Sequence, residues 1–432
     1  MIRSLLRELT GKVRRIEYCA MSVDLVSTCK GIVRVGSMPD VVKFMGEHGF
    51  REEIVVVPAW EVSMAGDNRT GEEFILWQDQ MRGGRLKEYV GLKHDVRQLE
   101  HNLDRIFPYF FDDRNLSVVR KDWLGNWFHS NIADPCCKFG GVEICCADND
   151  VVISEDGELI YRRSDFAPAY NSDKEVEAVL ESVVRDGKAR EFLEVVPIGC
   201  GNGVVGTVAN SIVRFGEYVI WIDPCGYPAK TLARHGIHWD DVTHYLFTHN
   251  HEDHVQGFTA CLERARRHGR KLNMIIADSV FRVMKELYAP LFPDLENYVQ
   301  RFSLKPGTAL FLGAVKIESR WNHHILPYGS IGLKISAGGN CFGYSGDTKY
   351  DEAINKILNR PELDAQWFAD CDLVFHEIEF DNPDSVHSHW KQVAALQSRI
   401  RGKVLGYHCP HLGCPSFPLA EEGRSYTLKD LF

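Results

Sequence analysis

Long apolar runs are missing from this chain of 432 residues. A membrane-spanning helix needs about 20 consecutive apolar residues, and no stretch of the sequence approaches that length. The first residues, Met1–Leu9, include arginines but lack the continuous apolar core of a secretory signal. We therefore expect no membrane association and a cytoplasmic location.

An excess of positive charge is missing as well. Lysine and arginine number 50 against 60 aspartate and glutamate residues, which leaves a net charge of −10. Binding to nucleic-acid polymers requires clustered cations facing the phosphates, so this balance argues against it. The basic run at residues 264–271 is best explained as the solvated end of a helix. We expect a small-molecule substrate.

Cysteine is too sparse for a disulfide scaffold, with 13 residues in the whole chain, and we expect reduced thiols. Two adjacent pairs, Cys136-Cys137 and Cys145-Cys146, flank a Gly-Gly sequence that predicts a hairpin bringing the pairs together. A structural zinc or redox site is one interpretation of this cluster. Plain packing is the other, because zinc ribbons use C-x-x-C spacing rather than adjacent cysteines.

A dense group of metal-ligand residue types follows a short apolar run. Residues 248–254 read Thr-His-Asn-His-Glu-Asp-His. Side chains two apart leave a strand on the same face, so His249 and His251 can face one cation while Asp253 and His254 reach a second. Neutral imidazole and carboxylate are ligands that zinc prefers. A polar surface loop is the alternative, and supporting residues elsewhere argue against it.

These supporting residues occur at the ends of other apolar segments. Asp223 ends one such segment upstream, and Asp347 follows another beside a glycine. His324 precedes Asp347, and His408 follows it near the end of the chain. The sequence therefore offers enough ligands, in a regular order, for two cations.

This order resembles that of the metallo-β-lactamase superfamily: Asp, H-x-H-x-D-H, His, Asp, His. The resemblance implies a four-layer αββα sandwich and a dinuclear metal site. It assigns one cation to His249, His251 and His324, and the other to Asp253, His254 and His408. It also makes Asp347 the bridge between the cations, Asp223 the residue that orients a ligand histidine, and Asp253 a catalytic residue as well as a ligand.

Within the superfamily the chain is similar to the RNase Z-like phosphodiesterase branch. The glycine-rich turn at residues 198–203 resembles the opening of that branch. His324 stands in an H-x-x-P sequence, which resembles the branch and selects His324 rather than His323. Only one of two adjacent residues can point at a given cation. The motif spacing favours His324, and a shift of the register by one residue would make His323 the ligand instead.

Two further segments carry the same resemblance. His376-Glu377 resembles the branch's "HEA" strand with Ile378 in place of alanine, and His387-Ser388-His389 resembles its "HST" segment with histidine replacing threonine. In this branch the first histidine of that segment assists the leaving group, so the resemblance makes His387 the candidate general acid. His389 is a possible substitute. The alternative is that His376, His387 and His389 only support the ligands through hydrogen bonds and transfer no proton, and Glu377 is expected in the same supporting role.

We expect a dinuclear hydrolase with two divalent metal ions, zinc first, with manganese or iron as alternatives. By resemblance it is a phosphodiesterase acting on a small or cyclic nucleotide, or another small phosphodiester, through a metal-bridging hydroxide. The same site would suit an ester, thioester or lactone hydrolase. A diiron redox or oxygen-binding protein is the third hypothesis.

The sequence also suggests an order of domains. Residues 1–170 are predicted to form a separate α+β domain of unknown role, and residues 171–193 a connecting helix. The metallo-β-lactamase-fold hydrolase domain is predicted to span residues 194–432. Homodimers are common in the superfamily, so a second copy of the chain is a candidate partner.

Overall fold

The computed structural model describes most of the chain. The described residues are 6–18, 21–36, 45, 49–57, 62–63, 66–67, 87–97, 100, 128–147, 150–166, 173–202, 206–289, 291–324, 329–363, 365–409 and 416–430. Contacts divide the chain into two compact units. The first unit comprises residues 1–63 and 67–172, and the second comprises residues 64–66 and 173–432.

The second unit contains a seven-stranded sheet in the order β19-β18-β17-β16-β15-β14-β26. The strands from β26 to β16 pair antiparallel, and those from β16 to β19 pair parallel. Their bounds are β14 Arg190–Gly199, β15 Asn210–Gly216, β16 Tyr218–Ile222, β17 His244–Phe247, β18 Leu272–Ala277, β19 Val299–Leu304 and β26 Tyr426–Thr427. Strand β17 is buried along its whole length, as expected of a parallel strand covered on both faces.

A six-stranded sheet forms the other half of this unit, in the order β20-β21-β22-β23-β24-β25. The first four strands pair antiparallel, and β23, β24 and β25 pair parallel. Their bounds are β20 Ala309–Leu312, β21 Val315–Trp321, β22 Ile331–Ala337, β23 Asn340–Tyr344, β24 Leu373–Glu377 and β25 Lys403–Tyr407.

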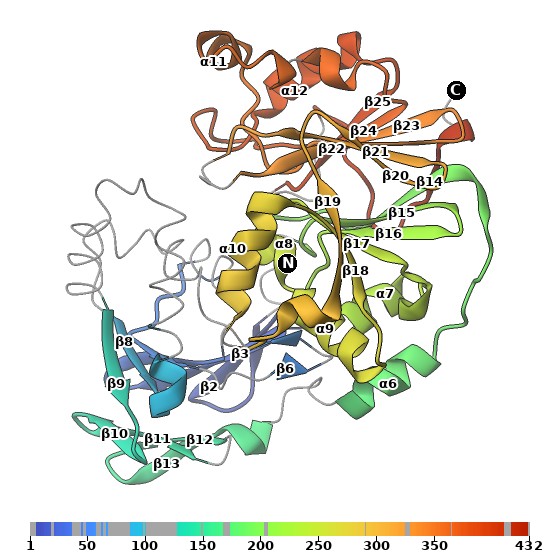
Figure 1. The fold of residues 1–432 in the computed structure, drawn as a ribbon. Helices are drawn as coiled ribbons and strands as arrows, with labels where there is room; N and C mark the ends of the chain where they lie inside the picture. Colours follow the sequence, from blue (N-terminus) through green and yellow to red (C-terminus); the bar gives the residue numbers. More distant parts are fainter. Residues whose placement is uncertain are drawn as a thin grey trace. The chain divides into compact units, whose positions relative to one another are not determined.

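Helices cover the outer faces of the two sheets. Helices α9 (Phe258–Arg267) and α10 (Asp278–Tyr288) pack against β18, and α12 (Trp390–Leu396) packs against β25. Between the sheets, β14 contacts β22 and β23. Figure 1 shows these layers, and the αββα sandwich predicted from the sequence is confirmed. The remaining α-helices are α6 Asp173–Glu181, α7 Pro228–Arg234, α8 Glu252–Val255 and α11 Glu352–Ile357.

The first unit repeats the strand arrangement of the second. Its seven-stranded sheet has the order β1-β2-β3-β4-β5-β8-β9, antiparallel as far as β4 and parallel from β4 to β9. The antiparallel sheet β10-β11-β12-β13 follows, as β20 to β23 follow in the second unit. No sequence motif indicated this repeat.

The bounds in the first unit are β1 Leu6–Glu8, β2 Val13–Tyr18, β3 Met21–Thr28, β4 Gly31–Val35, β5 Ile54–Val56, β8 Lys87–Gly91, β9 Phe128–Ile132, β10 Cys136–Phe139, β11 Val142–Ala147, β12 Asp150–Glu155 and β13 Glu158–Arg162. A two-stranded sheet joins β6 Val62–Ser63 and β7 Gly66–Asp67.

Seven short 3₁₀ helices are described in the two units together, the first of them in the first unit and the others in the second. They are η3 Arg163–Phe166, η4 Trp239–Asp241, η5 Leu295–Tyr298, η6 Pro361–Leu363, η7 Ala365–Phe368, η8 Gln397–Arg399 and η9 Leu428–Asp430.

The repeat extends to the turn of one hairpin. Phe139 pairs with Val142 across the β10–β11 turn, and Leu312 pairs with Val315 across the β20–β21 turn. Each two-residue turn begins with a glycine at positive φ, 63° at Gly140 and 55° in the second unit. A two-residue turn whose first residue has φ near +60° favours glycine there, so the same local chemistry closes both hairpins.

The predicted cysteine hairpin is confirmed, but the prediction of reduced thiols is wrong for one pair. Cys136 and Cys145 lie directly opposite each other in the register of β10 and β11, and a disulfide joins them. Cys137 and Cys146 remain free thiols. The pairing register of the two strands brings these two sulfurs together. Because both are used in the disulfide, the four cysteines do not form a zinc site.

The connecting helix predicted for residues 171–193 is shorter than expected. Helix α6 ends at Glu181, and residues from Arg190 onward belong to β14, which pairs with β15. Val184, which lies between the two elements, is 87% exposed. Pairing with a neighbouring strand therefore overrides the local helical periodicity. No helix among the described residues is both long and apolar enough to cross a bilayer.

Candidate metal centre

Most of the predicted ligands lie just after strands; His324 follows the antiparallel strand β21, and Asp253 and His254 lie in the short helix α8 after β17. His249 and His251 come directly after β17, and Asp347 comes three residues after the end of β23. Glu377 is the last residue of β24, and His408 follows β25 with a positive φ of 47°. Because side chains at the carboxyl ends of parallel strands meet at one edge of a sheet, residues far apart in the sequence gather there.

One group consists of His249, His251, His324 and Asp347, whose candidate ligand atoms all lie within 4.8 Å of one another. Asp347 Oδ2 is 3.9 Å from His249 Nε2 and 4.0 Å from His324 Nε2. The His249 and His324 side chains are 0% and 1% exposed. The structure thus brings together the residues that the sequence assigned to the first cation.

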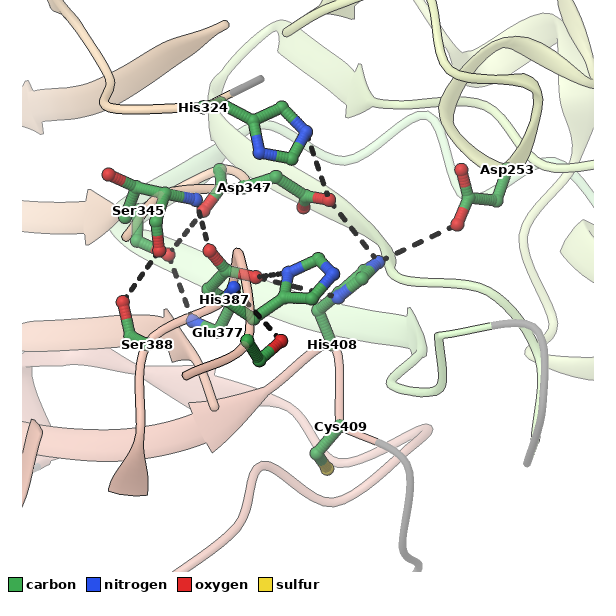
Figure 2. Close-up of polar contacts among 12 residues, drawn as sticks. Asp253, His324, Ser345, Asp347, Glu377, His387, Ser388, His408 and Cys409 are labelled. Atoms are coloured by element: carbon green, nitrogen blue, oxygen red, sulfur yellow. Dashed lines mark hydrogen bonds and ion pairs between the residues drawn. The ribbon is translucent and has the colours of Figure 1, made fainter. Parts of the chain in front are cut away.

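A second group consists of Asp253, His254 and His408, again within 4.8 Å. His408 Nε2 lies 3.7 Å from Asp253 Oδ2 and 3.7 Å from Asp347 Oδ2. His254 Nε2 lies 3.3 Å from Asp347 Oδ1. Figure 2 shows Asp347 and Asp253 on either side of His408. Asp347 therefore faces both groups.

Burial and mutual repulsion keep imidazoles of the first group neutral. Burial lowers the pKa of His324 to about 3, and it lowers the pKa of His249 well below its usual value, an effect that His254 increases. Burial opposes ionisation of Asp347, but His408 and His254 hold its pKa well below its usual range. The first group thus offers neutral nitrogen lone pairs and one carboxylate.

This donor set fits divalent cations. His254 Nε2, His408 Nε2 and Asp347 Oδ1 are buried atoms without a hydrogen-bond partner. Buried polar atoms normally find partners, so a cluster of such atoms facing one another calls for an explanation. Imidazole nitrogen and carboxylate oxygen are the donors that zinc and related divalent metals accept. A bound cation would satisfy these atoms.

Asp223 holds one of the ligand histidines in place. Its Oδ2 lies 2.9 Å from His254 Nδ1, and its Oδ1 accepts a hydrogen bond of 2.8 Å from the backbone N–H of Thr248. The hydroxyls of Thr248 and Tyr344 donate to the same carboxylate, at 2.8 and 3.3 Å. Because Nδ1 is engaged in this way, His254 presents Nε2 to Asp347.

His387 and Glu377 form a pair beside the second group. His387 Nδ1 donates to Glu377 Oε2 at 2.5 Å, and the other Glu377 oxygen accepts from the backbone N–H of Thr348. Both side chains join Asp347 and His408 in a third cluster of ligand atoms within 4.8 Å. Burial opposes protonation of His387, but Glu377 outweighs it and raises the pKa of His387 to about 9. A protonated imidazole thus stands at the centre.

His376 and His389 lie outside these groups. His376 Nδ1 donates to the carbonyl of Glu377 at 2.8 Å, and its ring packs near Tyr350 and Phe368. His389 caps the start of α12, where its side chain accepts from the backbone N–H of Gln392. In both cases the contact of the side chain is with backbone groups.

Of the two adjacent histidines, the structure brings His324 to the centre. His323 contributes its backbone carbonyl, which accepts a hydrogen bond of 2.7 Å from the N–H of Lys349. The H-x-x-P spacing had selected the same residue.

A lysine that carried no sequence signal holds the loop bearing His387. Lys349 Nζ donates to the carbonyl of Pro383 at 2.6 Å and to that of Ser385 at 2.7 Å. Ser388 Oγ donates to the carbonyl of Thr348 at 2.6 Å. These bonds join the loop to the segment that follows Asp347, and a lone lysine after a motif gave no reason to expect them.

The match to a known family decides the classification. A sequence profile described as "Anti-Pycsar protein Apyc1" matches residues 193–413, more than half of the chain. The chain belongs to this family. The matched segment contains every predicted site residue from Asp223 to His408, so the Apyc1 family assignment and the geometry concern the same part of the molecule.

Two relatives were compared with this Apyc1 family member. It is 25% identical over 210 residues to "Anti-Pycsar protein Apyc1" of Paenibacillus sp. (strain J14). The matched region covers 46% of this chain and 81% of the relative. It is 22% identical over 233 residues to "cGMP-dependent 3',5'-cGMP phosphodiesterase A" of Dictyostelium discoideum, with 49% of this chain and 26% of the relative covered. The match thus spans about a quarter of the Dictyostelium protein.

Solved structures give two further likenesses. The metallo-β-lactamase fold protein YhfI from Bacillus subtilis aligns with a TM-score of 0.45 and 18% identity over 54% of this chain and 99% of that protein. A long form RNase Z from yeast aligns with a TM-score of 0.43 and 12% identity over 97% of this chain and 71% of that protein. At identities this low, likeness says nothing about the substrate.

Membership in the Apyc1 family and the αββα sandwich confirm the predicted metallo-β-lactamase fold. The Apyc1 family member is a metal-dependent hydrolase, since the residues that could bind metal lie together in the matched segment.

Proposed function

We propose that the second unit hydrolyses a small phosphodiester, and that a cyclic nucleotide is its substrate. The observation that carries this proposal is the His387–Glu377 pair beside Asp347 and His408. An alkoxide leaving group of a phosphodiester needs a proton, and an imidazole held protonated at the centre can supply it. The Dictyostelium relative, named for action on 3',5'-cGMP, supports this substrate class.

In this proposal two divalent cations, zinc first, occupy the centre. His249, His251 and His324 would hold one cation, Asp253, His254 and His408 would hold the other, and Asp347, which faces both groups, would be their shared ligand. Cations bound there lower the pKa of coordinated water and offset the negative charge of a phosphate. Asp223 fixes the orientation of His254 and so the position of the second cation.

The chain's own residues handle the protons. His387 donates a proton to the departing sugar oxygen, and Glu377 keeps the imidazole protonated and oriented until then. Asp253, besides binding a cation, accepts a hydrogen bond from the attacking water, because its carboxylate faces the same space as His408. The ring of the cyclic nucleotide opens and leaves a nucleoside monophosphate.

The test combines elemental analysis of purified protein with a substrate panel. The panel contains the 3',5'-cyclic nucleotides of all four bases, bis-(p-nitrophenyl) phosphate and p-nitrophenyl acetate, each tested also with Asp347→Ala. Metal-dependent conversion of a cyclic nucleotide to its monophosphate supports the proposal. Turnover of p-nitrophenyl acetate alone would instead indicate an ester or lactone hydrolase. Bound iron with visible absorption and no turnover would indicate a redox or oxygen-binding protein.

A further inference from the structure

Two buried cysteines lie close together outside the metal centre. Cys341 Sγ and Cys371 Sγ are 3.3 Å apart, and the residues are 6% and 0% exposed. Cys341 lies near the start of β23, and Cys371 lies two residues before β24, which pairs parallel with β23. The metal-centre residues Asp347 and Glu377 lie at the other ends of these strands, so the thiols are separate from that site.

Backbone bonds hold the two cysteines in this relation. The N–H of Cys341 donates to Asp372 Oδ2 at 2.8 Å, and the N–H of Asp372 donates to the carbonyl of Cys341 at 2.8 Å. Asp372 follows Cys371 directly, so these bonds fix the segment that bears the second thiol. The sulfurs are therefore neighbours because of the fold, although 30 positions separate them in sequence.

We propose that Cys341 and Cys371 form a dithiol that oxidises reversibly to an intramolecular disulfide. A disulfide requires an S–S distance of about 2.05 Å, which rotation of the two side chains can reach from adjacent backbone positions. The product would join β23 covalently to the segment that leads into β24. The inference does not depend on the proposed substrate or on the metals.

The two thiols have different roles in the oxidation. A hydrogen bond from Cys371 lowers the pKa of Cys341 and outweighs burial, which raises it, while Lys334 opposes the effect of Asp370; Cys341, which is also the less buried of the two, is therefore the attacking thiol. Its thiolate attacks a peroxide, which becomes water and leaves a sulfenic acid on Cys341. The Cys371 sulfur then attacks that sulfur, the S–S bond forms, and a second water leaves. Overall, two thiols lose two hydrogens and one peroxide gains them.

A metal site on the same cysteines is the competing interpretation. Asp370 lies with both cysteines in a group of ligand atoms within 4.8 Å. However, Asp370 Oδ1 already pairs with Lys334 Nζ at 3.2 Å, and its side chain is 64% exposed. Structural zinc sites use four ligands, and within the described ranges no fourth donor joins this group. Two adjacent thiols favour the disulfide.

Mass spectrometry of the full-length protein tests the proposal. Purified reduced protein is treated with hydrogen peroxide, alkylated and digested with trypsin. Cleavage after lysine and arginine, but not before proline, places Cys341 in peptide 335–349 and Cys371 in peptide 357–391, each as the single cysteine. We expect a linked pair of these peptides, two hydrogens lighter than their sum, that dithiothreitol separates. We also expect a Tm several degrees above that of the reduced protein.

Two cysteine variants test the order of the oxidation steps, and the linkage measured in the wild-type protein is independent of both variants. Cys371→Ser should stop at the sulfenic acid, trapped on Cys341 by dimedone, and Cys341→Ser should form no link. Linkage measured in the wild-type protein keeps the test valid if either variant fails to fold. Both peptides alkylated after oxidation would overturn the proposal. So would zinc that protects both thiols and persists in Asp347→Ala but not in Cys341→Ser.

Discussion

At the scale of single residues, the pair of His387 and Glu377 is the group to which we assign proton donation, and metal binding is assigned to other side chains. We expect His387→Ala to lower kcat on a cyclic nucleotide by about 10²–10⁴-fold, the usual contribution of general acid catalysis. Turnover of bis-(p-nitrophenyl) phosphate should fall far less, because p-nitrophenolate leaves without a proton. Steady-state kinetics on both substrates measures the difference.

The matched control for this variant is His389→Ala, which removes a cap of α12 rather than a group at the centre. It should affect both substrates equally, through stability. Equal losses in His387→Ala would remove His387 from the role of general acid.

The same pair predicts a pH dependence. Burial opposes protonation of His387, but Glu377 raises its pKa to about 9, so the imidazole is protonated below that value and loses its proton above it. Bound cations lower this pKa. We therefore expect kcat on a cyclic nucleotide to decline on the alkaline side, with a midpoint at or below about pH 9. A pH profile that keeps this decline in His387→Ala would assign it to another group.

Asp223 offers a residue-scale test of ligand orientation. Asp223→Asn keeps the size of the side chain but weakens its bond to His254 Nδ1. Loss of such a partner typically costs about 10–100-fold in metal affinity. Metal titration should show this loss, while circular dichroism stays unchanged. Wild-type affinity in this variant would mean that His254 is held by other contacts.

At the scale of elements, the loop between β24 and α12 decides where His387 lies. Lys349 bonds two carbonyls of that loop, and its own backbone N–H bonds His323 beside a predicted ligand. This one residue connects the loop that bears His387 with the loop that bears His323 and His324.

We expect Lys349→Met to misplace His387 and lower kcat on a cyclic nucleotide by up to about 10²-fold, since catalysis is sensitive to displacements near 1 Å. Metal content and turnover of bis-(p-nitrophenyl) phosphate should change little. Lys349→Arg retains donors and should recover much of the activity. A loss that is the same for both substrates would point to general destabilisation instead.

Elements also show where local sequence patterns fail. The connecting helix was predicted to reach residue 193, yet Arg190–Gly199 forms a strand because β15 lies beside it and supplies hydrogen-bond partners. In contrast, the predicted strand and histidine loop at residues 245–254 agree with β17 and the segment after it. A buried parallel strand is apolar along its whole length, so its sequence signal does not depend on its neighbours.

At the scale of the whole molecule, the repeat of strand order raises the question of a second metal site. In the first unit the residues that follow β5 read Val-Pro-Ala-Trp-Glu at positions 57–61, without a histidine. The corresponding loop after β17 contains His249 and His251. We therefore expect the second unit to hold all the metal.

The combined variant His249→Ala/Asp347→Ala should reduce metal content from about two equivalents per chain to near zero and abolish metal-dependent turnover. The fold should persist, as judged by circular dichroism. His94→Ala in the first unit is the control and should change neither quantity. If the combined variant retained half the wild-type metal content or more, the chain would have a further metal site.

The domain bounds and the homodimer remain predictions. Measurement of the size of the protein in solution tests the homodimer.

The sequence by itself determined the order of the candidate ligands and the family resemblance, and that resemblance implied the αββα sandwich. These features are local, because strand signals and metal-binding loops are written in adjacent residues. Tertiary structure alone decided which distant residues meet: Glu377 with His387, Lys349 with the loop at Pro383, and Cys341 with Cys371. Distances between such residues depend on strand order and register, which arise from packing of the whole chain and leave no mark in any short segment.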